Sequence, residues 1–120
     1  HLCDRRQRQM CIRDRAYSVY LLQKDDQNIG YLTISRTDGI VLQSLYILSE
    51  YQRQGIGRAA FDFIKAYCRE HGAKFFTCHC VPENLNARAF YEKMGGEVIR
   101  TDLANEEPWQ NSVTYRFAAA

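Results

Sequence analysis

The stretch that decides the fold reads Leu45-Tyr46-Ile47-Leu48-Ser49-Glu50-Tyr51-Gln52-Arg53-Gln54-Gly55-Ile56-Gly57-Arg58. A strand ends here, a polar loop follows, and two glycines open a helix. Apolar residues at helical spacing predict that this helix runs from about Gly55 to Glu70. A helix N-terminus presents unpaired backbone N–H groups and a partial positive charge. The local chemistry therefore favours a phosphate cradle, to which Arg53 and Arg58 add charge.

Outward from this turn, the sequence predicts a single α/β domain. Three strands joined by tight turns precede the helix and indicate an antiparallel meander. The strand, helix and strand around the turn predict a right-handed unit with parallel strands. We therefore expect three layers, with helices on both faces of a mixed, mostly antiparallel sheet. The expected strands are Ala16–Lys24, Ile29–Arg36, Ile40–Leu48, Lys74–Val81, Glu97–Asp102 and Ser112–Phe117, and a second short helix is expected over Leu85–Met94.

Other nucleotide-binding motifs fit this turn poorly. A P-loop needs Gly-Lys-Ser/Thr, whereas Gly57 is followed by Arg58-Ala59. A dinucleotide-binding fingerprint follows the first strand of a βαβ unit, whereas this turn follows the third strand of a meander. On these residues alone, a tight turn with solvated arginines stays open as an alternative.

The charge pattern argues against a nucleic-acid partner. The net charge is +2, yet residues 1–15 carry five arginines and two aspartates, so the other residues sum to −1. A nucleic-acid binder should carry clustered basic residues on its folded face. Residues 9–15 resemble a translated sequencing-library adaptor, and we therefore leave 1–15 out of the fold as a non-native arm. A disordered basic arm is the alternative.

Two further classes are disfavoured. No apolar run approaches the roughly 20 residues that span a bilayer, so no membrane association is expected. The chain has five cysteines, an odd number, and none has the paired C-x-x-C spacing of a zinc site. Cys78 and Cys80 alternate on one strand and share a face, so we expect them to stay unpaired. Reduced thiols favour a cytoplasmic protein without a metal.

Two motifs together resemble a known family. Gln52-x-x-Gly55-x-Gly57 after a strand resembles the acetyl-CoA-binding motif of the GNAT acetyltransferases. Asn84-Leu85-Asn86-Ala87-Arg88-Ala89-Phe90-Tyr91-Glu92-Lys93-Met94-Gly95-Gly96 resembles the family's next block. The pair, in the family's order, is far more specific than either motif alone. The resemblance implies a GNAT domain over 16–118, with a central parallel strand pair that splays to admit acetyl-CoA. It also implies that the fold's first strand and helices are missing here.

The resemblance implies which residues hold acetyl-CoA. The backbone of Leu45, Tyr46 and Ile47 would pair with the pantetheine arm. Asn84 would contact the cofactor near its thiol. The pyrophosphate would be held by Arg53, Gln54, Gly55, Ile56, Gly57 and Arg58.

The resemblance also implies that Tyr91 is the general acid that protonates the departing thiolate. Asn84, Ala87 and Tyr91 share one stripe of the short helix, and a phenol can donate a proton to a thiolate. The alternative is a tyrosine packed in the core. His79 lies where several family members place a general-base glutamate, and its imidazole suits that role. A strand histidine with a structural hydrogen bond is an equal alternative, and Glu50, Gln43 or a water relay are weaker ones.

The expected reaction is transfer of an acetyl group from acetyl-CoA to a primary amine of a small molecule or peptide, by direct attack in a ternary complex. A non-catalytic CoA-binding regulatory module is the alternative. Loop 103–111, with Glu106, Glu107 and Trp109, is a candidate wall for a cationic acceptor, although a charged surface loop is the plainer interpretation. The acceptor stays unnamed, and a homodimer stays open.

Overall fold

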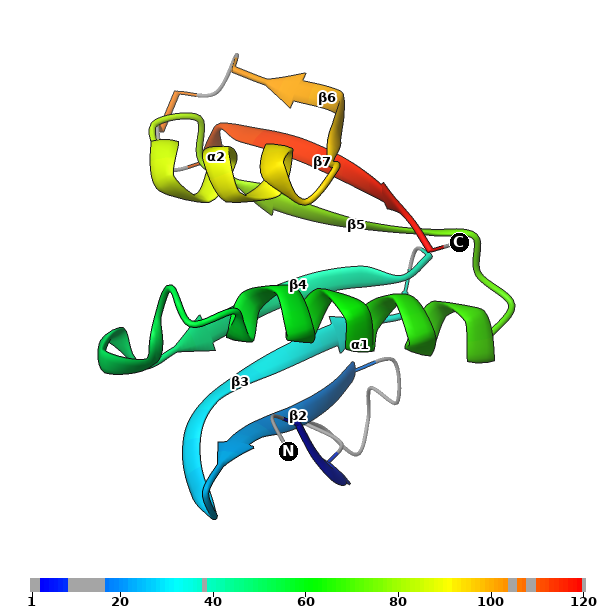
Figure 1. Ribbon diagram of the computed structural model, residues 1–120. Helices are drawn as coiled ribbons and strands as arrows, with labels where there is room; N and C mark the ends of the chain where they lie inside the picture. Colours follow the sequence, from blue (N-terminus) through cyan, green and yellow to red (C-terminus); the bar gives the residue numbers. More distant parts are fainter. Residues whose placement is uncertain (1–2, 9–16, 38, 104–105, 108–109, 120) are drawn as a thin grey trace.

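The computed structural model describes residues 3–8, 17–37, 39–103, 106–107 and 110–119, with side chains described from Tyr17 onward. The order of elements confirms the α/β class (Figure 1). The strands are β1 (Cys3–Arg8), β2 (Tyr17–Lys24), β3 (Gln27–Ser35), β4 (Val41–Ile47), β5 (Phe75–Cys80), β6 (Glu97–Asp102) and β7 (Ser112–Ala118). The helices are α1 (Ile56–Glu70) and α2 (Leu85–Lys93), with a 3₁₀ turn, η1, at Ser49–Tyr51.

The strands form one seven-stranded sheet in the order β1-β2-β3-β4-β5-β7-β6. Every neighbouring pair is antiparallel except β4 and β5, which are parallel. The expected mixed, mostly antiparallel sheet with a central parallel pair is thus confirmed. The β2–β3 turn uses Asp25 and Asp26, both with positive φ (53° and 65°), which suits the twist of a two-residue hairpin.

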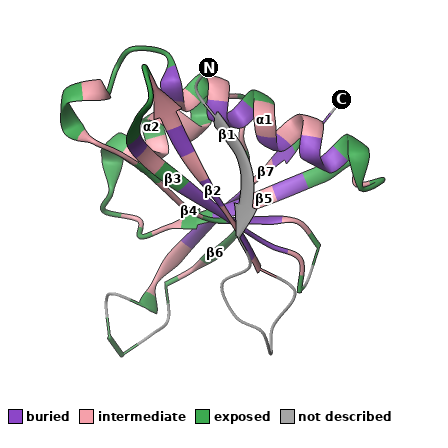
Figure 2. Ribbon diagram, turned by 90° about the horizontal axis from the view of Figure 1, so that it is seen from below, coloured by how far each residue is buried: buried purple, intermediate pink, exposed green. Residues whose placement is uncertain are grey.

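Both described helices cover the same face of the sheet, whereas we expected helices on both faces (Figure 2). The ring of Phe61 in α1 lies 5.3 Å from that of Phe90 in α2 and 5.5 Å from that of Phe76 in β5. The reason is the handedness of the crossovers. The connections β4–α1–β5 and β5–α2–β6 both join parallel strands and advance in the same direction across the sheet. Right-handed crossovers of that kind put their helices on one side.

Strand β1 comes from the arm that was left out of the sequence-based fold. It pairs antiparallel with β2, with Gln7 opposite Tyr20 and Arg8 opposite Val19. An edge strand is held by backbone hydrogen bonds, which any non-proline sequence can make. The arm can therefore join the sheet as an edge strand without a pattern of alternating apolar residues.

An extra residue in β4 opens the centre of the sheet. Opposite β3, Ser44 pairs with Thr33 and Leu42 with Ile34, so Gln43 is a β-bulge. The parallel ladder between β4 and β5 consists of Val41↔Thr77 and Leu42↔Cys78 and ends beside the bulge. Beyond that point β5 stays paired with β7, while β4 follows β3. We call the resulting opening between Gln43–Ile47 and the end of β5 the fork; it is the splayed pair that the fold class predicts.

An aromatic cluster holds the helices to the sheet on the β5–β7 side. Phe61, Phe76, Phe117 and Tyr115 are all almost fully buried. Edge-to-face and offset ring contacts of this kind add to the stabilisation that comes from burying their area. Neither described helix has the length and hydrophobicity needed to cross a membrane.

Candidate functional site

The fork exposes backbone hydrogen-bonding groups of β4. The Leu48 N–H donates to the Ile29 carbonyl across the hairpin, at 2.8 Å. Backbone groups alternate in direction along an antiparallel strand, so those of Leu45 and Ile47 point the other way, toward β5. Past Leu42 the ladder to β5 has ended, and these groups face the fork. An extended, amide-bearing chain could pair with them as an added strand does.

The loop after β4 delivers the chain to the N-terminus of α1 beside the fork. Gly55 is the N-cap and has a left-handed φ of 83°, and Arg53 also has a positive φ, 63°. The Ala59 N–H donates to the Gly55 carbonyl at 3.1 Å and makes the first hydrogen bond of the helix. The amides of Ile56, Gly57 and Arg58 precede it and have no acceptor within the helix. This is the geometry that the sequence predicted for anion binding.

Side chains of the loop hold it against the fork. The Gln52 side-chain amide donates to the Ile47 carbonyl at 2.9 Å, and that of Gln54 donates to the Glu50 carbonyl at 3.1 Å. Lys24 of β2 donates to the Gln54 side-chain oxygen at 3.2 Å. Sequence reasoning missed Lys24 because it lies far away in the chain. Gln54 is one of the residues predicted to bind the cofactor. Its side chain forms hydrogen bonds within the site loop and to Lys24, so its backbone N–H is the group that it could offer to a ligand.

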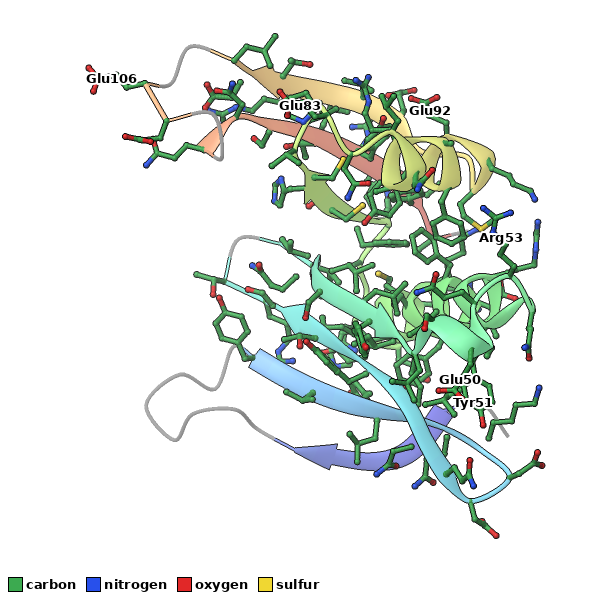
Figure 3. All side chains as sticks on the ribbon, turned by 90° about the vertical axis from the view of Figure 1, so that its left-hand side faces the viewer. Glu50, Tyr51, Arg53, Glu83, Glu92 and Glu106 are labelled. Carbon is green, nitrogen blue, oxygen red and sulfur yellow. The ribbon has the colours of Figure 1, made fainter. Side chains whose placement is uncertain are left out.

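Charged side chains are distributed unevenly around the site. Arg53 and Arg58 are exposed at the α1 N-terminus. Figure 3 shows Arg53 and Glu50 on one side of the molecule and Glu106 on the opposite side. The loop that carries Glu106 is therefore remote from the anion-binding turn, and Trp109 of that loop lies outside the described residues.

Gly57 has a packing role that the motif did not indicate. A Cβ at this position would lie 2.8 Å from the ring of Phe90. The glycine therefore lets α2 approach the first turn of α1 closely. This contact brings the helix that carries Tyr91 next to the N-terminus of α1.

Asn84 caps α2, as the sequence predicts. Its side-chain oxygen accepts a hydrogen bond from the Ala87 N–H at 3.1 Å. The resemblance also implies contact between Asn84 and the cofactor, which stays a prediction. The side-chain NH₂ is the part of Asn84 that the cap does not use.

Tyr91 is half-buried on α2, in an aromatic setting. Its ring lies 5.5 Å from that of Tyr115 and 6.1 Å from that of Phe117. Cys78, the last β5 residue of the parallel ladder, is close enough to influence the pKa of the phenol. Burial raises the pKa of the phenol above its ordinary value, and the neighbouring Cys78 raises the pKa further. Tyr91 therefore lies at the closed end of the fork and holds its proton firmly.

A polar network fixes α2 to β7 on either side of Tyr91. The buried Tyr115 hydroxyl accepts from Arg88 Nε at 3.0 Å and donates to Glu92 Oε2 at 2.8 Å. Arg88 and Glu92 are one helical turn apart and flank Tyr91. Sequence reasoning did not find this network, because Tyr115 lies far from α2 in the chain.

His79 lies on the other face of β5. Side chains alternate along a strand, so His79 points away from the face on which Cys78 is buried. The His79 Nδ1 lies 2.8 Å from the Thr114 hydroxyl, directly across the β5–β7 ladder. The side chain is exposed, so its other ring nitrogen is accessible to an amine substrate. The two predicted catalytic groups thus lie on opposite faces of the sheet.

The remaining candidates, Tyr46 for the cofactor and Gln43 and Glu50 as weaker bases, are dispersed. Tyr46 is 48% exposed and lies beside Tyr31, with ring centroids 5.8 Å apart. Gln43 is the bulged residue, and the Glu50 side chain is exposed in η1. An open hollow of about 540 Å³ lies at the other end of the β4–β5 pair, between Arg36 and Thr77, and includes none of the predicted site residues. Among the described residues, no three His, Cys, Asp or Glu side chains gather as metal ligands.

Comparison with known proteins identifies the class that this fold and site define. The sequence profile of the acetyltransferase (GNAT) family matches residues 1–96, which is most of the chain. The chain therefore belongs to the GNAT acetyltransferase family.

Individual relatives are more distant. An uncharacterized N-acetyltransferase encoded in the pepI 3′ region of Lactobacillus delbrueckii subsp. lactis is 26% identical over 85 residues, covering 63% of this chain and 49% of the relative. The chain thus spans about half the length of this curated relative. A GNAT-family protein from Desulfovibrio desulfuricans has a TM-score of 0.78 at 20% identity, over 88% of this chain and 71% of that chain. A GNAT family acetyltransferase from Elizabethkingia anophelis with acetyl-CoA bound has a TM-score of 0.75 at 14% identity, over 86% and 76%. These structural likenesses establish the fold.

Proposed function

We propose that this protein is an acetyl-CoA-dependent N-acetyltransferase, which transfers the acetyl group to a primary amine of a small molecule or peptide in a ternary complex. The observation that carries the proposal is the fork, where β4 has left β5 and its edge lies between the amides of α1 and Tyr91. Family membership supports acetyl transfer in general. The related structure from Elizabethkingia anophelis holds acetyl-CoA.

The described residues suit the pyrophosphate, the pantetheine arm and the thioester of acetyl-CoA. The amides of Gly55–Arg58, with Arg53, Arg58 and the nearby Lys24, offer donors and positive charge to a pyrophosphate. The backbone groups of Leu45 and Ile47 match the alternating amides of a pantetheine arm. The same donors near Ile47 would polarise the thioester carbonyl.

Proton transfers fall to groups on opposite faces of the sheet. The amine, deprotonated through His79 or water, attacks the thioester carbonyl directly. The thiolate then leaves and takes the proton of Tyr91, whose raised pKa keeps it in the acid form until that moment. Positioning and carbonyl polarisation supply most of the rate, and Tyr91 contributes on the order of 10²–10⁴-fold.

The test has a binding arm and a catalytic arm. Isothermal titration with acetyl-CoA should show binding to the whole chain. A thiol-release assay with polyamines, amino sugars and peptide N-termini should then find an acceptor. Binding without thiol release for any amine would favour the non-catalytic CoA-binding module, and absence of binding would overturn both functions.

Tyr91→Phe tests the acid. We expect kcat to fall by on the order of 10²–10⁴-fold with unchanged acetyl-CoA affinity. Tyr31→Phe, at an exposed tyrosine outside the site, is the matched control and should retain wild-type kcat. An unchanged kcat in Tyr91→Phe across the pH range would remove Tyr91 from this role.

A further inference from the structure

Thr114 of β7 contacts the ring of His79. The two residues lie directly opposite each other in the β5–β7 ladder, and the His79 Nδ1 is 2.8 Å from the Thr114 hydroxyl. Thr114 is only 7% exposed, whereas the His79 side chain is exposed. His79 also follows Cys78, the last β5 residue of the parallel ladder, so this pair lies beside the fork.

The available donors and acceptors decide which of the two groups donates. A distance of 2.8 Å suits either direction. Within the part of the chain that the structure describes, the Thr114 hydroxyl has no other hydrogen-bond partner. If Nδ1 donated, the hydroxyl proton of this buried side chain would lack an acceptor, which is costly. If the hydroxyl donates, its proton and the Nδ1 lone pair are both satisfied, and the neutral ring carries its own proton on Nε2.

This tautomer leaves the neutral ring of His79 without a free lone pair. The Thr114 hydroxyl engages the lone pair of Nδ1, and Nε2 already bears a proton. We propose that Thr114 is a positioning residue that holds His79 in this tautomer, so that His79 donates a hydrogen bond to the acceptor substrate and is not its base. This inference rests on the proposed acetyl transfer, and it assigns the proton of the amine to water.

The proton balance follows from this assignment. One N–H bond of the substrate ammonium breaks, and the proton forms an O–H bond with a water molecule, which passes it to bulk solvent. The freed lone pair of the amine then attacks the thioester carbonyl. The Nε2–H of His79 donates to an oxygen of the acceptor, such as a hydroxyl or carbonyl next to the amine. The expected acceptors are therefore amines with such an oxygen, for example amino alcohols.

Nitrogen NMR of the imidazole rings tests the tautomer without cofactor or activity. At about pH 8.5, where an ordinary imidazole is neutral, proton–nitrogen correlation distinguishes a protonated ring nitrogen from an unprotonated one. The signals lost in His79→Gln identify His79, and we expect its proton on Nε2. His71 is an internal reference for the opposite tautomer, because its Nδ1 lies 2.8 Å from the Tyr67 carbonyl, which can only accept. A His79 proton on Nδ1 would overturn the inference, whether or not the protein acetylates any amine.

Substitutions at Thr114 test the positioning role. Thr114→Val keeps the shape of the side chain and removes the donor, so the Nδ1 signal of His79 should move, and Thr114→Ser should restore it. Thr77→Val is the matched control, because Thr77 lies on the same strand and face as His79 but opposite Arg116. An unchanged Nδ1 signal in Thr114→Val, or an equal change in Thr77→Val, would contradict the role of Thr114.

Kinetics distinguish a donor from a base. With an amino alcohol as acceptor, His79→Ala should lower kcat/KM about fivefold, as for the loss of one hydrogen bond, with unchanged KM for acetyl-CoA. His79→Gln keeps an N–H donor but cannot take a proton, and it should recover most of that loss. A plain alkylamine of the same length should show no such difference between the variants.

A fall of on the order of 10²–10⁴-fold in both His79 variants would identify His79 as the base and overturn the inference. Failure of the proposed acetyl transfer would look different, because wild-type protein would then release no thiol with any amine.

Discussion

Tyr91 combines a polar task with an apolar setting. The phenol is packed among aromatic rings at the point where the two central strands diverge. Burial of this kind disfavours the charged phenolate and so raises the pKa of the side chain. The Tyr91 phenol therefore stays protonated near neutral pH. It gives up its proton only to a strong base, such as a departing thiolate.

This setting predicts the alkaline side of the pH profile. A raised pKa means that the acid form of Tyr91 persists above the ordinary pKa of tyrosine, about 10. We therefore expect kcat to show no alkaline decline attributable to Tyr91 between about pH 7 and about pH 10. The measurement is kcat at saturating acetyl-CoA in wild type and Tyr91→Phe. A decline below about pH 9 that disappears in Tyr91→Phe would contradict the raised pKa.

At the scale of elements, α2 depends on a few anchors. It has no buried residue of its own and is held by its cap, its aromatic contacts and the Tyr115 network. The position of the Tyr91 phenol thus depends on contacts at both ends of a short helix. A change at its cap should reach the site as well as the stability of the fold.

Asn84→Ala should lower the free energy of unfolding by about 1 kcal/mol, because the Ala87 N–H loses its acceptor. Urea denaturation measures this, and Asn84→Ser should retain most of the stability. Asn86→Ala, at an exposed site in the same helix, is the control and should be close to neutral. If Asn84 served the cofactor alone, the substitution would weaken acetyl-CoA binding and leave unfolding unchanged.

Gly30 allows the close approach of β3 and β4 near the mouth of the fork. A Cβ there would lie 2.0 Å from the Tyr46 carbonyl oxygen, so the backbone itself would have to move. We expect Gly30→Ala to lose about 1–3 kcal/mol of stability in urea denaturation and to weaken acetyl-CoA binding by displacing β4. Gly39→Ala is the contrast: its φ of 76° is strained for alanine, yet nothing lies within 4 Å, so binding should be unchanged.

Periodicity predicted most of these elements, and it failed where no periodic signal exists. The hydrophobic spacing along α1 and the turn residues between strands placed the elements to within a few residues. The bulge at Gln43 leaves no mark in the sequence, because one added residue looks like any polar residue of a strand. Strand β1 is held in the sheet by backbone hydrogen bonds, which leave no pattern in the sequence. The common face of the two helices did follow from crossover handedness, but only once the strand order was known.

The candidate site also has features that the sequence predicts and features that it does not. The amides of α1 and the cap at Asn84 depend on local spacing, and the sequence predicted both. The ring partners of Tyr91 come from α1 and β7, and the contact of Gly57 with Phe90 joins two helices. Such long-range contacts arise from packing, which a single sequence does not reveal.

At the scale of the whole molecule, buried thiols link stability to pH. Burial raises the pKa of Cys68 to about 11 and that of Cys78 to about 12, from 9.0 in an exposed thiol. Below about pH 9 both states of the chain keep these protons, and the stabilisation is complete. As pH rises from there toward the folded values, the unfolded chain releases protons that the folded chain retains, so stability falls.

Urea denaturation between about pH 7.5 and about pH 10.5 should therefore show a decreasing free energy of unfolding above about pH 9. Each thiol contributes a slope of at most about 1.4 kcal/mol per pH unit. The double substitution Cys68→Ala with Cys78→Ala should flatten this dependence, although it lowers stability at neutral pH. An equally steep decline in that variant would assign the effect to other groups, such as the buried Tyr20, whose pKa is also raised.

The extra residue in β4 has one more consequence. Leu42 and Leu45 both pack toward the core, although an odd number of positions separates them. Only the bulge reconciles that spacing with the alternation of a strand. A chain one residue shorter at Gln43 could pair with β3 without interruption and keep Leu42 and Leu45 inward, but it would lose the bulge beside which β4 leaves β5. The side chain at this position is therefore free to vary, whereas a deletion there should close the opening between the two strands.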